Sequence, residues 1–424
     1  MNQPTEPKAD KSGVRRHNLS LVLRTVHDAG ETTRAAVAAR VGLTRPAVSS
    51  LVEQLLDLGF LVESGKTFSG QAGRPGTVLK PAGTGPAGLG VEINVGHVTV
   101  CLVDLTGADR VRRTTAVDNR SAGASDVLAR AAGITADVLD EAAALGLRPA
   151  GAALALPGLV SHGVVRQAPN LGWRDVPAAA LFRDALAALR PAAHGLPAVS
   201  DNEANMAALA ELRCGAPDAP RTFLHLTGGT GVGGAVVVHG ELLRGAHGFA
   251  GEIGHLVVDA RGPRCRCGSR GCLEQYAGRH ALLRAADAPH TDELAARAGR
   301  GEPRALAALA EAGRMLGRAL SGAVNLLDPE AVVLGGVYPR LMPWLAPAVG
   351  EELAARVVSG LWPAGAPRLR AASPAADAAR GAAGLVLHDV LADPLAHTAP
   401  EAGPPAGSRK PAGGGGPGRA RVRR

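Results

Sequence analysis

The sequence contains few aromatic residues and no long apolar run. Phe, Trp and Tyr make up 2% of the 424 residues and hydrophobic residues 46%, so a core has to be built mainly from Ala, Val and Leu. No run of about 18 apolar residues, the length that a membrane-spanning helix requires, is present. The polar N-terminus (MNQPTEPKADKSG) lacks the apolar segment of a signal peptide. We therefore expect no contact with a membrane.

Cysteine is also scarce. The five cysteines are an odd number, and three of them, Cys265, Cys267 and Cys272, lie too close together for an ordinary disulfide framework. This usage is typical of a reducing compartment, so a cytoplasmic location is expected. Cys101 and Cys214 are interpreted as packing residues.

The positive charge is concentrated at the two ends of the chain. The net charge is +8, and residues 1–80 hold 11 basic against 7 acidic residues. Residues 391–424 hold 6 against 2, whereas residues 81–390 hold 29 of each. This distribution indicates a basic module attached to a neutral body and argues against uniform polyanion binding. The basic tail either adds non-specific phosphate affinity or has no function.

Residues 17–80 predict a winged helix-turn-helix, after a disordered segment 1–16. A first helix over 17–29 is followed by a second that Thr32 or Thr33 caps and Gly42 ends. Thr44 caps a third helix that has Pro46 in its first turn, and two short strands complete the wing.

The body has a different pattern. After an expected linker at 81–88, a strand, strand, helix alternation begins at residue 89 and recurs from residue 222. Two such halves, dividing near 195–200, predict a bilobal α/β domain over 89–391 with a cleft between its lobes. The Pro- and Gly-rich tail 392–424 is expected to have no fixed structure.

The candidate DNA contacts lie at the start of the third helix, which enters the major groove in such modules. They are Thr44, Arg45, Pro46, Ser49 and Ser50. Arg45 suits a bidentate contact with guanine, and Arg74 at the wing tip suits a narrow minor groove. Winged helices also serve as protein-protein modules, which is the alternative. A dimer on a two-fold operator is expected.

A metal site is predicted where three thiols fall within eight residues. Cys265, Cys267 and Cys272 lie among glycines that permit tight turns, and His255 is ten residues upstream. Three cysteines and one histidine can surround Zn²⁺ as a closed tetrahedral site, which would be structural and not hydrolytic. A cluster of reactive or merely buried thiols is the alternative.

Polar side chains suited to a polyol lie in three segments near the metal loop. The first is residues 201–205 (DNEAN), the second is residues 251–255 (GEIGH), and the third is Glu274. Carboxylates and amides pair with sugar hydroxyls, and a metal-held histidine keeps one tautomer. Taken singly, each acid is better explained as a cap or a surface group, and it is their proximity to the metal loop that favours a binding site.

Several motifs together resemble the ROK family of repressors and sugar kinases. They are Glu252-x-Gly-His255, the Cys-x-Cys-Gly-x-x-Gly-Cys-x-Glu loop from Cys265 to Glu274, and the segments 202–205 (NEAN), 229–234 (GTGVGG), 325–330 (NLLDPE) and 334–336 (LGG). The resemblance implies an actin-like ATPase fold of the RNase H-like kind and a structural zinc. It also implies sugar contacts at Asn202, Glu203, Glu252, His255 and Glu274.

The resemblance also marks two departures from a kinase. Kinases of the family resemble one another in an Asp-x-Gly-Gly-Thr phosphate loop, where this chain has Glu92-Ile-Asn94-Val95-Gly. The β-carbons of Asn94 and Val95 intrude where backbone must approach phosphate. The catalytic base is usually Asp, and here it is Glu203, whose extra methylene shifts a carboxylate by about 1 Å. No catalytic residue is therefore expected, and ATP is not expected as a cofactor.

The sequence thus predicts a sugar-responsive regulator, a repressor of carbohydrate uptake or catabolism genes. Its expected partners are operator DNA and a monosaccharide or sugar-phosphate effector, and its expected assembly is a homodimer or homotetramer. An ATP-dependent, glucokinase-like sugar kinase carrying a DNA-binding head is the alternative. A third possibility is a body that docks a phosphotransferase protein or another partner.

Overall fold

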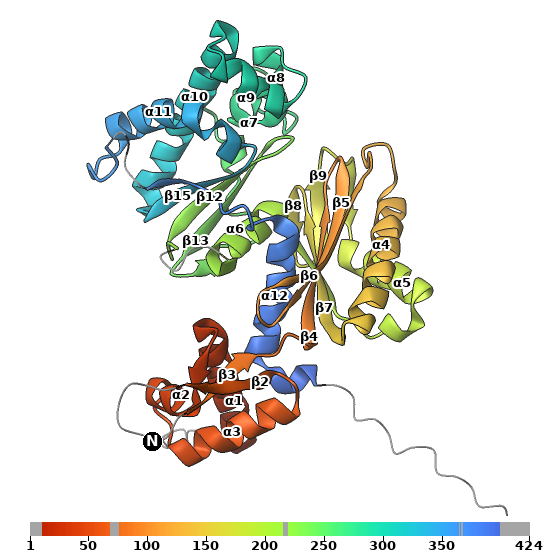
Figure 1. The fold of residues 1–424 in the computed structure, drawn as a ribbon. Coiled ribbons are helices and arrows are strands. Elements are labelled where there is room, and N and C mark those ends of the chain that lie inside the picture. Colours follow the sequence, from red (N-terminus) through yellow and green to blue (C-terminus); the bar gives the residue numbers. More distant parts are fainter. Residues whose placement is uncertain (1–10, 68–75, 215–218, 364, 366–367, 399–424) are drawn as a thin grey trace, which may run out of the picture.

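The chain folds into a small N-terminal head and a body of two lobes, joined by a long C-terminal helix (Figure 1). The computed structural model describes residues 11–67, 76–214, 219–363, 365 and 368–398. None of the helices within these ranges is long and apolar enough to cross a membrane. The wing tip with Arg74, Cys214's side chain and the basic tail from residue 399 lie outside the described part.

The head is a three-helix unit with a small antiparallel sheet in the order β1-β3-β2. Its elements are α1 (Lys11–Ala29), β1 (Thr32–Thr33), α2 (Arg34–Val41), α3 (Arg45–Asp57), β2 (Leu61–Thr67) and β3 (Gly76–Pro81). Thr33 and Thr44 cap α2 and α3 through their hydroxyls, as the sequence predicts. The turn between these helices passes through Gly42, at a φ of 70°.

The predicted disorder of residues 1–16 is wrong for residues 11–16, which belong to α1. Arg15 donates to the side chain of Gln54, and Arg16 forms an ion pair with Asp393. These partners lie 39 and 377 residues away, so the pattern of the N-terminus alone could not reveal them. Fixed structure also continues beyond the predicted end at residue 391, through η3 (Pro394–His397).

Lobe one is built on a five-stranded sheet in the order β11-β7-β4-β5-β6, with a three-stranded sheet β10-β9-β8 beside it. Its strands are β4 (Gly85–Ile93), β5 (His97–Asp104), β6 (Asp109–Ala116), β7 (Leu147–Leu156), β8 (Leu159–Ser161), β9 (Val164–Ala168), β10 (Trp173–Val176) and β11 (Ala198–Asn202). Its helices are α4 (Ala124–Ala144), α5 (Ala178–Leu189) and η1 (Pro191–Ala193).

The linker between head and body is much shorter than the predicted segment 81–88. Pro81 pairs with Leu61 at the end of β3, and Gly85 pairs with Leu147 at the start of β4. Glycine and proline indicated a loop, but backbone pairing with these distant strands overrides that local preference. Along the chain, only residues 82–84 lie between the last strand of the head and the first strand of the body.

Lobe two is built on a second five-stranded sheet, in the order β14-β13-β12-β15-β16. Its strands are β12 (Phe223–Gly228), β13 (Val232–Val238), β14 (Glu241–Leu242), β15 (Ala331–Gly336) and β16 (Leu369–Ala371). Its helices are α6 (Glu203–Cys214), η2 (Ile253–His255), α7 (Glu274–Ala277), α8 (Arg279–Ala286), α9 (Thr291–Gly299), α10 (Pro303–Leu327) and α11 (Tyr338–Arg356). Because β11 belongs to the first sheet, the chain crosses between lobes at residues 202–203, slightly later than predicted.

Helix α12 (Ala378–Ala392) returns from lobe two and lies directly on the backbone of β4 and α6 (Figure 1). A β-carbon at Gly88 or Gly90 would collide with carbonyl groups of α12, and one at Gly381 with the carbonyl of Met206. These glycines therefore allow the three elements to approach backbone to backbone. At its far end α12 shares a hydrophobic cluster with α1 and β5, which includes Leu23 and Leu387.

We predict that Gly90→Ala destabilises the fold by at least about 3 kcal/mol, because the added methyl group overlaps the carbonyl of Ala379. The midpoint of urea-induced unfolding measures the change. Gly133→Ala in α4 is the matched control, since a β-carbon there meets no atom within 4 Å. It should stabilise the helix by up to about 1 kcal/mol. Equal midpoints for both variants would contradict the close packing.

Candidate functional site

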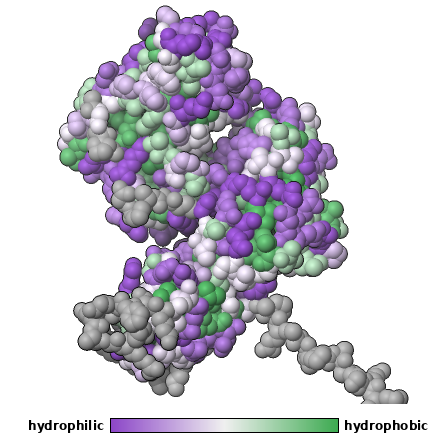
Figure 2. Space-filling model, in the orientation of Figure 1, coloured by the Kyte–Doolittle hydropathy of each residue, from purple (hydrophilic) through white to green (hydrophobic). Residues whose placement is uncertain are grey.

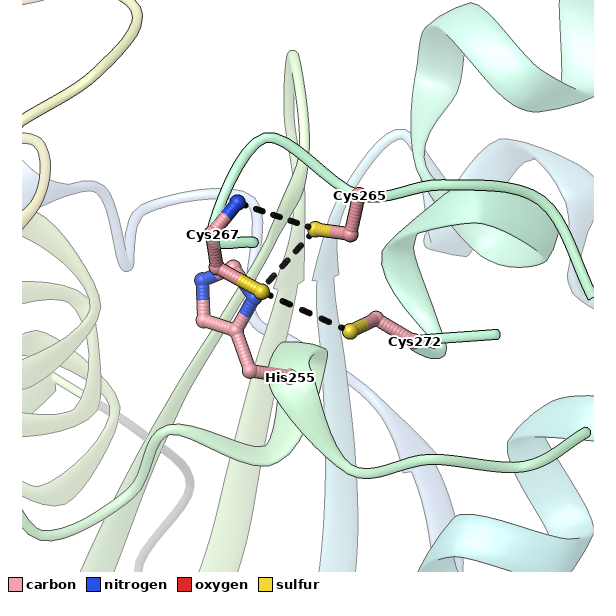
Figure 3. A group of neighbouring side chains, drawn as sticks. All are labelled: His255, Cys265, Cys267 and Cys272. Carbon is pink, nitrogen blue, oxygen red and sulfur yellow. Dashed lines mark hydrogen bonds between the residues drawn. The ribbon is translucent and has the colours of Figure 1, made fainter. Parts of the chain in front are cut away.

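One imidazole and three thiols converge at the edge of lobe two, in the group that the sequence predicts (Figure 3). Candidate ligand atoms of His255, Cys265, Cys267 and Cys272 all lie within 4.8 Å of one another. The Sγ atoms of Cys267 and Cys272 are 3.6 Å apart, and His255 Nδ1 is 3.7 Å from Cys265 Sγ. Tetrahedral coordination with bonds of about 2.3 Å places ligands about 3.8 Å apart. The group therefore fits a metal ion.

The local chain geometry forces the thiols together. Gly268 and Gly271 have φ values of 98° and 68°, which turn the loop sharply between Cys267 and Cys272. A β-carbon at Gly271 would also overlap the carbonyl of Asp259. Cys272 pairs with Val257 in a short bridge just after η2, which brings the loop back to His255.

Beside the metal group lies a cavity of about 100 Å³ between the lobes, where Figure 2 shows the body hollowed. The five residues predicted to contact sugar all line it: Asn202, Glu203, Glu252, His255 and Glu274. The cavity is far smaller than the roughly 300–1,000 Å³ of sites for drug-sized ligands. Its size and polar lining suit one small hydroxylated molecule.

Asn202 already has structural partners on both sides of its amide. Its Oδ1 accepts from the backbone N–H of Ala204 at 2.7 Å and caps α6. Its Nδ2 donates to the carbonyl of Gly158 at 2.7 Å. Asn202 therefore fixes the start of α6 against the loop after β7, and with it the position of Glu203.

Glu203 begins α6 and faces the turn between β4 and β5 of lobe one. Its Oε2 accepts a hydrogen bond of 3.0 Å from Asn94 Nδ2. Burial, and then the neighbouring carboxylate of Glu92, raise the pKa of Glu203 to about 7. His97 forms an ion pair with Glu92 at 3.3 Å, which raises the pKa of the histidine. Near neutral pH Glu203 is thus divided between its protonated and ionised forms.

Glu252 and Glu274 lie on either side of His255. Glu274 Oε1 accepts from Cys265 Sγ at 2.9 Å, so this carboxylate is tied to the metal loop. Gly231 leaves the space that Glu274 occupies, because a β-carbon there would overlap the carboxylate. Burial, and then the charge of Glu274, raise the pKa of Glu252. The metal loop therefore positions two acids and an imidazole on one wall of the cavity.

Two polar residues of the cavity wall, Arg266 and Asn170, were not predicted as site residues. Arg266, within the metal loop, donates to Asn170 Oδ1 of lobe one at 3.2 Å, and both line the cavity. This bond joins the lobes across the mouth of the site. Arg266 stands between two cysteines, which is a sequence signal, but its partner is 96 residues away.

A second cavity, of about 380 Å³, shares Glu203 and Gly229 with the first and extends toward β15 and the start of α12. His225 is fully buried in its wall, and burial lowers the pKa of this histidine to about 4. Its Nδ1 lies 3.3 Å from the hydroxyl of Thr227. Its Nε2 has no hydrogen-bond partner among the described residues.

The predicted DNA-reading residues lie together on the outer side of the head, at the start of α3. Thr44, Arg45, Pro46 and Ser50 are exposed, whereas Ser49 is half-buried. The Thr44 hydroxyl accepts from the N–H of Ala47, so it is engaged as a cap. Arg45 forms no hydrogen bond or ion pair with any residue within the described ranges.

Comparison with known proteins connects these features. The ROK family model matches residues 88–389. The xylose repressor of Bacillus subtilis is 27% identical over 370 residues, covering 83% of this chain and 90% of the repressor. A solved structure described as a ROK family transcriptional regulator, homologous to the E. coli MLC protein, superposes with a TM-score of 0.74 at 25% identity. The superposition covers 90% of this chain and 98% of the regulator's chain.

Enzymes match the body alone. The glucokinase of Thermotoga maritima is 34% identical over 281 residues, covering 59% of this chain and 82% of the enzyme. The fold is therefore common to regulators and to sugar kinases. The match that includes the head is to regulators.

We predict that Cys267→Ser weakens metal binding by more than about 100-fold. Changing a residue that only hydrogen-bonds a metal ligand costs up to about 100-fold, and loss of a ligand itself should cost more. Metal analysis after dialysis against a chelator measures it. Cys101→Ala is the control, because Cys101 is buried in β5 and takes no part in the group. Undiminished metal content in the Cys267 variant would show that this thiol is no ligand.

Glu203 should make stability depend on pH. Its folded pKa of about 7 exceeds the ordinary value of 4.5, so its favourable contribution is complete below pH 4.5 and is lost as pH rises through 7. Relative to wild type, Glu203→Gln should gain about 2 kcal/mol of unfolding free energy between pH 5 and pH 8. Urea titrations at both pH values test this. A constant difference would mean that the native pKa is not raised.

Proposed function

The chain belongs to the ROK family, and we propose that it is a sugar-responsive, DNA-binding repressor of carbohydrate uptake or catabolism genes. The observation that carries this proposal is the shared architecture. The xylose repressor and the ROK transcriptional regulator match head and body together, each over at least 83% of this chain.

In this proposal the sugar lies in the cavity beside the metal group. Glu203, Glu252 and Glu274 accept hydrogen bonds from its hydroxyls, with Asn202 and His255 as further contacts. The metal is Zn²⁺, held by the same imidazole and three thiols, and it has a structural role. Its ligands fix His255 in one orientation.

The head binds operator DNA through α3, with Arg45 reading a base in the major groove. Thr44, Pro46, Ser49 and Ser50 complete the contact surface, and Arg74 in the wing enters the minor groove. Two heads are needed for a two-fold operator, so the working form is a homodimer or a homotetramer.

Catalysis is not part of the proposed function. In a phosphate loop, backbone N–H groups must point at the phosphates. Here the N–H of Asn94 donates to the carbonyl of His97 at 2.9 Å, and that of Val95 to the side chain of Asn94 at 2.7 Å. The side chain of Asn94 also engages Glu203, the carboxylate at the base position. These groups satisfy one another, which supports a body that does not use ATP.

In this proposal, sugar binding reaches the head through α6, which begins at the cavity, and through α12, which packs on α6. Helix α6 begins at Glu203, and α12 lies against α6 and continues to α1. A sugar that prefers one angle between the lobes shifts these helices and the spacing of paired heads. Effector affinity must differ between the two states for the operator to be released.

The second candidate is an ATP-dependent sugar kinase that also carries a DNA-binding head. The glucokinase match and the 380 Å³ cavity beside Glu203 favour it. In that case the cavity would hold a nucleotide, and Glu203 would act as the base.

DNA selected from the genome by the zinc-loaded protein provides the operator for the deciding experiment. Fluorescence anisotropy then measures its affinity with and without each member of a monosaccharide panel. We expect one sugar to weaken operator binding at least about tenfold. The Glu252→Gln variant should bind the operator as the wild type does but should no longer respond to the sugar. Arg45→Ala should instead weaken DNA binding and leave sugar binding intact.

The same sugars are incubated with Mg-ATP to test the enzyme. Phosphorylation at about 1 s⁻¹ or faster, within the ordinary range for enzymes, would contradict the pure sensor. If no sugar changes either operator affinity or the melting temperature, the effector is not a monosaccharide. A protein partner for the body would then be the better explanation.

A further inference from the structure

The short turn between β5 and β6 contacts three elements that join the head to the body. It consists of residues 105–108 and follows Asp104, the last residue of β5. Asp104 is buried, and its Oδ1 accepts from the N–H groups of Thr106 at 2.8 Å and Ala108 at 3.2 Å. Gly107 completes the turn at a φ of 79°. These bonds give the turn one defined shape.

The first element is the linker, residues 82–84. The other carboxylate oxygen of Asp104, Oδ2, pairs with Arg110 Nη1 at 2.8 Å, and the same Nη1 donates to the carbonyl of Gly83. A β-carbon at Gly83 would lie 3.5 Å from that Nη1 and 3.7 Å from Asp104 Oδ2. Because a buried carboxylate fixes the guanidinium, Arg110 holds the linker at its middle residue.

The other two elements are α1 and α12, which donate to carbonyl groups of the same turn. His27 Nδ1 of α1 donates to the carbonyl of Leu105 at 2.9 Å. Arg380 Nη2 of α12 donates to the carbonyl of Gly107, and its Nη1 pairs with Asp109 at 3.3 Å. The side chain of Leu105 is buried in the hydrophobic cluster that α1 and α12 share. One turn of lobe one therefore bonds to the linker and to both helices.

Ion pairs continue from this turn to the second cavity. Asp109 pairs with Arg112 at 2.7 Å, and Arg112 pairs with Asp377 at 3.0 Å. Asp377 lines the 380 Å³ cavity and caps α12, where it accepts from the N–H of Arg380 at 2.8 Å. The start of α12, the strand β6 and the β5–β6 turn are thus joined by charged side chains.

We propose that the β5–β6 turn is a latch that fixes the angle of the head on the body, with Arg110 as the positioning residue that holds the linker. The N–H bonds of the linker region lie at its two ends, from Ala82 to Phe60 of the head and from Gly85 to Gly146 of the body. Gly83 lies between them and has no side chain to restrict rotation, so the bond from Arg110 opposes a change of direction there.

The polar bonds and the apolar cluster have different roles at this junction. Burial of apolar surface between α1 and α12 holds the head against the body, but it is non-directional. Hydrogen bonds depend on the angle between donor and acceptor. The bonds to the turn therefore select one orientation among those that the apolar contact would allow.

The consequence for DNA rests on the proposed function. In a dimer on a two-fold operator, the angle of each head sets the distance and the rotation between the two recognition helices. A latched head therefore makes the protein specific for one spacing of the half-sites. A head released from the latch would tolerate other spacings.

Hydrogen exchange of the full-length, zinc-loaded protein tests the latch without DNA or sugar. Arg110→Gln should speed exchange of the amides of residues 82–85 at least about fivefold and leave the amides of β7 unchanged. Arg113→Gln is the matched control, because it makes the same charge change on the same strand and Arg113 pairs with Glu141 of α4. Unchanged exchange at the linker in Arg110→Gln would overturn the proposal. So would equal acceleration throughout lobe one, because Arg110 would then only stabilise the sheet.

Operator spacing provides a readout that a general loss of stability would not change. Fluorescence anisotropy compares the operator selected above with a copy that has one base pair inserted between its half-sites, which rotates one half-site by about 35°. Wild type and Arg113→Gln should bind the altered operator at least about tenfold more weakly, and Arg110→Gln less than about threefold more weakly. A variant that is merely less stable would lose affinity for both operators alike.

The outcomes separate the latch from the proposed function. If Arg110→Gln discriminates between the operators as wild type does, or if wild type binds both equally, the latch does not set the head angle and the proposal is wrong. In either case the repressor proposal stands, because an operator is bound. If no operator is bound, the proposed function fails, and the exchange comparison alone decides whether the latch exists.

Discussion

The close approach of α12 to β4 and α6 is the constraint on which the rest of the structure depends. At Gly88, Gly90 and Gly381 the backbones of these elements approach so closely that a β-carbon would overlap a carbonyl group. Close packing leaves few voids at this interface, so α12 has no free space in which to slide gradually along β4 or α6. It can rotate as a unit or remain in place. Lobe one, lobe two and the head therefore all pack against one helix, α12.

The candidate metal group and the cavity beside it form one structure and not two neighbouring sites. His255 belongs to both, and Glu274, next to Cys265, also lines the cavity. Removing the metal would therefore alter the shape of the polar wall as well as the stability of the loop. The bond between Arg266 and Asn170 extends this dependence to lobe one, because the loop that holds the metal also closes the mouth of the cavity.

Local rules located most of the elements and the four side chains of the candidate metal group. Thr33 and Thr44 cap helices through their own neighbours, and the three thiols lie within eight residues, so both signals are contained in short segments. The errors concern partners that are distant in sequence. The ion pair of Arg16 with Asp393 orders a segment expected to be disordered, and the pairing of Gly85 with Leu147 turns an expected linker into a strand. The residue pattern of a short segment carries no information on such contacts. At 81–88 the glycine and proline content even predicted a loop where the chain forms strands.

The head has a core that the head alone does not complete. Leu19 and Leu23 of α1 pack in the same hydrophobic cluster as Leu387 and Val390, from the last helix of the body. During synthesis the head emerges first, yet those partners are made more than 350 residues later. Contacts of such long range form late, because loop closure precedes the gain from burial. An unfinished or truncated chain would therefore present an incompletely packed α1 and a poorly supported α3. If the proposed function holds, operator binding therefore requires a chain whose body is already complete.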